Sequence, residues 1–111
     1  MIFIDTGAFL GRYWRHDQRH QESLRLWETI VEHQEACFTS NFVLDEFFTL
    51  HARRDSYAVE FFRKFADQKV SYTDCISFVL MRKHRLKRVF SFDKHFLLAG
   101  FHPFQGSPEE I

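Results

Sequence analysis

Two acidic residues of this chain directly follow apolar runs of the kind that form buried strands. Asp5 comes after Ile2–Ile4, and Asp93 comes after residues 89–92, in which only Ser91 is polar. An unbroken apolar run indicates a strand that is covered on both faces, as in a parallel sheet. Because ligands of open α/β sheets bind at the carboxyl edge, both carboxylates are candidates for chemistry. The structural alternative for Asp5 is that its side chain only caps the following helix.

Two further acids, Glu46 and Asp74, are predicted on helices that pack against this sheet. Glu46 falls inside the apolar face of a helix expected over residues 42–54. A buried carboxylate is costly unless it is paired or bound to a cation, so Glu46 either pairs with an arginine or binds a metal. Asp74 opens another helix, where Ser71-x-x-Asp74 fits a capping box. Metal binding is the alternative role for Asp74.

Together these acids indicate a site for a hard divalent cation. Four carboxylates cannot all stay ionised in one pocket without a compensating positive charge. Mg²⁺ and Mn²⁺ bind carboxylate and water oxygens and leave coordination positions open for a phosphate. Such a site would activate a water for in-line displacement at phosphorus. The four residues therefore favour a metal-dependent phosphoryl-transfer reaction.

Strands and helices are expected to alternate around these acids. Besides the two runs that end in aspartate, a buried strand is expected at residues 36–39 and an edge strand in the tail after Gly100. Amphipathic or apolar helices are expected over residues 8–14, 18–33, 42–54, 57–66, 75–81 and 94–99. The first turns of the helix after Asp74 are expected to be buried on all sides. This order predicts a single α/β domain over residues 1–111 with a short, mostly parallel sheet.

The composition and the cysteines limit the class of protein. Lys+Arg and Asp+Glu both number 15, so net charge favours neither a nucleic acid nor a membrane as partner. No apolar run is long enough for a membrane span or a signal peptide. Cys37 and Cys75 lack metal-type spacing and have apolar neighbours, which predicts buried thiols in a reducing compartment. We therefore expect a cytoplasmic protein without membrane contact.

The segments that carry the four acids have a characteristic order. They read MIFIDTGAF at the start, SNFVLDEF around Glu46, SYTDCISF around Asp74 and VFSFDKHFLLAGF around Asp93. Together they resemble the PIN domain, in particular the VapC-type toxins of bacterial and archaeal toxin–antitoxin pairs. The resemblance spans nearly the whole chain.

This resemblance implies a three-layer α/β/α fold and a Mg²⁺-dependent endoribonuclease, with Mn²⁺ as the alternative ion. It also implies supporting hydroxyl groups at Thr6 and Ser91, and a cognate antitoxin with a segment that fills the groove. The catalytic acids and metal ligands that it implies are Asp5, Glu46, Asp74 and Asp93.

One region departs from the family pattern. Between Glu46 and Asp74 the chain is shorter than the pattern, which places a further helix and an edge strand there. Only the helix at residues 57–66 is expected to remain, so the predicted sheet lacks one edge strand. The backbone at residues 36–39 would then be unpaired on one side, and an open edge must be covered, blunted or paired. We therefore expect a homodimer, formed by edge pairing or by segment exchange.

Basic and aromatic side chains are candidates for RNA contacts. Tyr13, Trp14 and Tyr72 could stack on unpaired bases, with packing in the core or an interface as the alternative. Basic side chains contact phosphates whatever the RNA sequence, and ordinary solvated surface is the alternative for each of them. The candidates are Arg12, Arg15, Arg53, Arg54 and Lys94.

Two other functions are compatible with parts of the sequence. A catalytically inactive PIN-like module would bind RNA or a protein without cutting; the short region supports it, and the intact set of acids opposes it. A receiver-like or phosphatase-like protein would use Asp5 as nucleophile. It would need a second acid two residues later, where Gly7 stands, and it leaves Asp93 unexplained.

Overall fold

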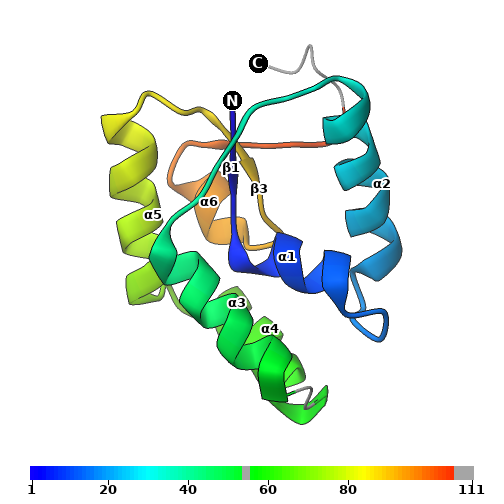
Figure 1. Ribbon diagram of the computed structural model, residues 1–111. Helices are drawn as coiled ribbons and strands as arrows, with labels where there is room; N and C mark the ends of the chain where they lie inside the picture. Colours follow the sequence, from blue (N-terminus) through cyan, green and yellow to red (C-terminus); the bar gives the residue numbers. More distant parts are fainter. Residues whose placement is uncertain (54–55, 107–111) are drawn as a thin grey trace.

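A four-stranded parallel sheet forms the centre of the described part of the chain (Figure 1). The computed structural model describes residues 1–53 and 56–106, without the side chains of residues 53, 56, 57 and 67. The strands lie in the order β2-β1-β3-β4. Their bounds are β1 (Ile2–Ile4), β2 (Cys37–Phe38), β3 (Arg88–Phe90) and β4 (His102–Pro103). The mostly parallel sheet and the tail strand expected from the sequence are therefore confirmed.

Six helices connect and cover these strands within the described residues. None of them is long and apolar enough to cross a membrane. The bounds are α1 (Thr6–Tyr13), α2 (His20–Glu32), α3 (Asn41–Arg53), α4 (Ser56–Gln68), α5 (Tyr72–Lys83) and α6 (Lys94–Leu98). Each helix lies within a few residues of the range expected from the sequence.

The helices pack on both faces of the sheet, because successive side chains of β1 point to opposite faces. Ile2 and Ile4 belong to a core cluster with Leu26 and Ile30 of α2. Phe3 belongs to a second cluster, which contains residues of α3, α5 and α6. Figure 1 shows α2 on one side of the strands and α5 and α6 on the other. The three-layer α/β/α fold is therefore confirmed.

A third cluster extends the core beyond the carboxyl end of β1. It joins Leu10 of α1, Phe47 of α3 and Val59 of α4. The α3–α4 pair lies past the end of β1, where the chain turns into α1 (Figure 1). Between α3 and α5 the described residues form α4 and no strand, which leaves β2 at the edge of the sheet.

Two expectations about burial were wrong. The segment around β2 was expected to be a buried strand, but β2 is two residues long, and Cys37 is exposed. Cys75 is exposed as well, and Val79 of the same helix is 61% exposed. Since β2 is an edge strand and α5 packs through one side only, apolar neighbours in the sequence do not ensure burial. Because both thiols are exposed, the cysteines no longer support the expectation of a reducing compartment.

Candidate active site

The four acids meet at the carboxyl edge of the sheet, around a cavity of about 290 Å³. Asp5 follows β1, Glu46 lies on α3, Asp74 lies in the first turn of α5, and Asp93 precedes α6. All four line this cavity. Side chains from segments far apart in the sequence are thus brought into one pocket.

Asp5 is held by a hydroxyl group and not used as a helix cap. It occupies the N-cap position of α1, but its side chain makes no capping hydrogen bond, so the capping alternative was wrong. Instead, the Ser91 hydroxyl donates to Oδ2 of Asp5 at 2.8 Å. Burial raises the pKa of Asp5 to about 7, against the lowering effect of the Ser91 hydrogen bond, and the charges of Asp93 and Glu46 add to the rise. A carboxylate in this position is costly without a nearby cation.

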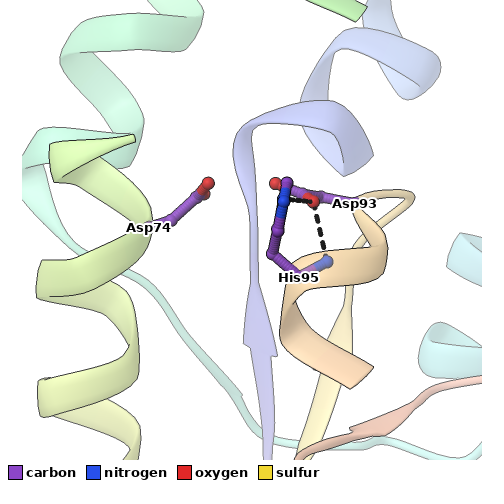
Figure 2. Close-up of side chains that lie close together, drawn as sticks. All are labelled: Asp74, Asp93 and His95. Carbon is purple, nitrogen blue, oxygen red and sulfur yellow. Dashed lines mark hydrogen bonds and ion pairs between the residues drawn. The ribbon is translucent and has the colours of Figure 1, made fainter. Parts of the chain in front are cut away.

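Asp93 lies in a network that begins at the same serine. Its backbone N–H donates to Oγ of Ser91 at 3.0 Å. Oδ1 of Asp93 accepts the backbone N–H of His95 at 2.9 Å and lies 2.7 Å from Nδ1 of the His95 ring (Figure 2). Asp93 therefore caps α6 while its carboxylate stays at the cavity wall.

Glu46 has a hydroxyl donor and no arginine partner. Oγ1 of Thr6 donates to Oε1 of Glu46 at 2.6 Å. Among the side chains that the structure describes, no arginine forms an ion pair with Glu46. Burial raises the pKa of Glu46, and the charge of Asp93 adds to this rise. Asp45 is exposed, as expected from its place on the helix.

Asp74 caps α5 and also lines the cavity. Ser71 and Asp74 form a complete capping box, in which Oδ2 of Asp74 accepts the Ser71 N–H at 3.1 Å. The carboxylate is nevertheless buried and points across the pocket toward Asp93 (Figure 2). Burial, followed by the charges of Asp5 and Asp93, raises the pKa of Asp74 to about 8. Capping and metal binding are thus compatible at this residue.

Three possible metal ligands, two of which line the cavity, lie close together. One ligand atom from each of Asp74, Asp93 and His95 lies within 4.8 Å of the other two. His95 was not among the residues expected in the site, although its position two residues after Asp93, in the first turn of a helix, could have suggested it. Oxygen-rich donors with raised pKa values suit a hard cation such as Mg²⁺ or Mn²⁺, which also accepts an imidazole less readily.

The basic residues of the cavity wall are not those expected from the sequence. Arg12, Arg15 and Lys94 are exposed and do not line this cavity, the Arg53 side chain is not described, and Arg54 lies outside the described residues. The cavity is lined instead by Arg19, Arg63 and Lys64. Two of these come from α4, which only the tertiary packing brings to the site.

The three aromatic candidates differ in their surroundings. Tyr13 is 58% exposed, with the Arg12 guanidinium 5.2 Å from its ring centre. Trp14 packs against the third core cluster. Tyr72 is 72% exposed, and its ring lies edge-on to that of Phe42. None of these three rings lines the cavity of the acids.

Comparisons with known proteins identify the fold. No family model matches the chain. It is 28% identical to the 23S rRNA-specific endonuclease VapC20 of two Mycobacterium tuberculosis strains, over 91% of this chain and 95% of the relative. The crystal structure of M. tuberculosis VapC20, described as a Sarcin-Ricin loop cleaving toxin, matches with a TM-score of 0.65, covering 91% of this chain and 96% of that one. This chain therefore has a PIN-like fold and resembles a VapC-type toxin ribonuclease.

The PIN-like domain described here is shorter than the relative. The alignment with VapC20 spans 128 positions, more than the 111 residues of this chain, so the relative has residues without a counterpart. The resemblance inferred from the four motifs is confirmed over nearly the full length. The helix α4 between α3 and α5 supplies Arg63 and Lys64 to the cavity wall.

Proposed function

We propose that this PIN domain is a metal-dependent endoribonuclease and the toxin of a VapBC-type toxin–antitoxin pair. The observation that best supports the proposal is the cavity shared by Asp5, Glu46, Asp74 and Asp93. The pKa values of three of these acids are raised, mainly by burial, so the pocket as a whole favours a bound cation. The similarity to an endonuclease of the same fold supports RNA as the substrate class.

The proposed cofactor is Mg²⁺ or Mn²⁺. The residues that would hold it are Asp5, Glu46, Asp74 and Asp93, with the His95 ring beside Asp74 and Asp93. When bound, the ion would acidify a water for attack on the phosphodiester and stabilise the leaving oxygen.

The side chains around the acids hold them in position. Ser91 fixes Asp5 through its hydroxyl and Asp93 through the backbone, while Thr6 fixes the carboxylate of Glu46. The His95 ring nitrogen contacts Oδ1 of Asp93. Such outer contacts limit the orientations of the carboxylates, which lowers the cost of ordering them around a substrate. Thr6, Ser91 and His95 are therefore proposed as positioning residues.

An RNA cleavage assay tests the proposal. The substrates are a single-stranded RNA, an unrelated RNA hairpin and a hairpin with the Sarcin-Ricin loop of 23S rRNA, since that loop is named for VapC20. Wild type is compared with Asp5→Asn in Mg²⁺, Mn²⁺ and EDTA. We expect cutting by wild type in either ion, and none in EDTA or by the variant.

A folded wild type that binds Mn²⁺ but cuts no RNA would contradict the proposal. It would instead support a PIN-like module that binds RNA or a protein without catalysis. Metal binding alone does not separate these functions, because an intact acidic pocket can bind an ion in either case.

The proposed partners are an RNA substrate, a cognate antitoxin and a second copy of the chain. The second copy is proposed because, within the described residues, β2 pairs with a strand on one side only, which leaves its other edge open to pairing. The Arg12, Arg15 and Lys94 side chains stay candidates for contacts with RNA away from the cavity. Arg53 and Arg54 stay candidates for contacts with RNA. A cytoplasmic location follows from the proposed action on RNA.

A further inference from the structure

The wall of the cavity contains an aromatic ring in contact with two guanidinium groups. Phe92 lies between Ser91 and Asp93 in the sequence and lines the cavity. The Arg19 guanidinium carbon lies 5.2 Å from the centre of the Phe92 ring, and that of Arg63 lies 5.5 Å from it. Both distances are typical of cation–π contacts. Two guanidinium groups thus lie beside one ring in the wall of the acidic cavity.

Arg63 is committed to contacts within the protein. Its side chain is 10% exposed and forms an ion pair with Asp17, which is 2% exposed. It also donates from Nη2 to the carbonyl oxygen of Gly7 at 3.2 Å. Breaking a buried pair would leave an unpaired charge, so these contacts keep Arg63 in place. Arg63 therefore holds α4 against the start of α1 and fixes the position of Phe92.

Arg19 is in a different situation. Its side chain is 46% exposed, and its ion pair with Glu22, at 3.3 Å, is equally exposed. Pairs of this kind contribute little to stability and exchange readily for another anion. Arg19 stands at the N-cap position of α2, where its side chain makes no capping bond. The guanidinium can therefore leave Glu22 for a ligand without disturbing the helix.

We propose that Arg19 binds a phosphate of the RNA substrate, while Phe92 holds the guanidinium plane at the cavity wall. The inference rests on the proposed function, because RNA is the ligand. Burial and like charge make the acidic side of the cavity unfavourable for a phosphate in the absence of a cation. The side of the cavity that is lined by Arg19, Arg63 and Lys64 attracts a phosphate. The planar guanidinium can donate two parallel hydrogen bonds to phosphate oxygens, which lysine cannot do.

The test measures binding of RNA separately from cleavage. Fluorescence anisotropy records the affinity of the full chain for a short fluorescein-labelled single-stranded RNA in EDTA, over a range of NaCl concentrations. The variants are Arg19→Ala, Arg19→Lys and Phe92→Leu. The control is Arg25→Ala, which removes an equal charge from the exposed surface of α2 and does not line the cavity.

We expect Arg19→Ala to weaken binding about 10-fold, with a circular dichroism spectrum and melting temperature like those of wild type. The slope of log affinity against log salt should fall by about 0.7, the value for one lost contact with single-stranded RNA. Arg19→Lys and Phe92→Leu should keep the wild-type slope with a smaller loss of affinity, because the charge remains. Arg25→Ala should match wild type in both quantities.

Equal affinity and equal salt slope for Arg19→Ala and Arg25→Ala would overturn the inference. Wild-type binding too weak to measure at low salt would overturn it as well. If Arg19 proves to bind RNA but wild type cuts none in Mg²⁺ or Mn²⁺, the proposed nuclease activity fails and the phosphate contact stands. If wild type cuts RNA and Arg19→Ala changes nothing, only the phosphate contact fails.

Discussion

The Ser91 hydroxyl donates to Oδ2 of Asp5 at 2.8 Å, although 86 residues separate the two in the chain. The hydroxyl oxygen of Ser91 also accepts the backbone N–H of Asp93 at 3.0 Å. One hydroxyl therefore links the segments that follow β1 and β3, which are neighbours in the sheet. It fixes the distance between two acids of the proposed metal site.

Replacing this serine should slow cleavage without unfolding the protein. Ser91→Ala removes both hydrogen bonds, and we expect the rate of RNA cleavage to fall about 10–100-fold, as for other outer contacts of metal ligands. Ser77→Ala is the matched control, since that buried hydroxyl donates to the Thr73 carbonyl within α5 and does not line the cavity. Equal rates for the two variants would show that Ser91 does not position the acids.

Two neighbouring acids of α3 should differ sharply in their effect. Glu46→Gln keeps the shape of the side chain but removes its charge at the cavity, and we expect cleavage to fall at least about 100-fold. Asp45→Asn makes the same kind of change on an exposed side chain and should leave cleavage within twofold of wild type. Similar activity in the two variants would exclude Glu46 from the metal site.

The metal-free protein should lose stability as the pH rises. The pKa of Asp5 is raised from 3.8 to about 7 in the folded state, so between these values the folded chain binds more protons than the unfolded chain. The free energy of unfolding then decreases with pH over this window. The contribution of Asp5 is on the order of 2–4 kcal/mol.

Asp5→Asn should remove the Asp5 contribution to this pH dependence, because an amide stays neutral and still accepts the Ser91 hydrogen bond. The measurement is urea unfolding of both proteins in EDTA at pH 5 and pH 8. Parallel stability curves for the two proteins would mean that Asp5 is already ionised at neutral pH in the folded state.

His95 should contribute to binding of Mn²⁺. Its ring nitrogen contacts Asp93, and it lies within the group formed with Asp74. We expect His95→Ala to weaken Mn²⁺ binding about 10-fold in calorimetry. His33→Ala, at the exposed C-terminal end of α2, is the control. Recovery of affinity in His95→Asn would indicate that the ring orients Asp93, while continued loss would indicate direct ligation.

The open edge of the sheet leads to a prediction about assembly. If two copies pair through β2, their exposed Cys37 thiols come close together. Mild oxidation of a Cys75→Ser variant should then give a disulfide-linked dimer, and Cys37→Ser should prevent it. Light scattering at micromolar concentration should show a dimer before oxidation, whereas a monomer there would exclude edge pairing.

The sequence was most informative where local pattern and chemistry coincide. The largely apolar runs before Asp5 and Asp93 predict buried parallel strands, and strands of this kind end at one edge of the sheet. The helical projection was sufficient to distinguish Glu46 from Asp45, because the core of this domain lies on one side of α3.

Other features depend on contacts that no local pattern records. Cys37 has apolar neighbours, but its exposure follows from the absence of a further strand beyond β2 among the described residues. Arg19 and Arg63 belong to separate segments, and the fold brings the guanidinium group of each to the Phe92 ring. The basic residues that lie near a site can therefore be identified only once the packing of the helices is known.

The position of β1 between β2 and β3 has a consequence for protein synthesis. A ribosome adds Asp5 well before its Ser91 partner and Asp93. A nascent chain therefore carries the first carboxylate without the others, and it has no assembled pocket. A translation product that ends before β3 would lack Asp93 and the Ser91 partner of Asp5, so it could not form the acidic pocket.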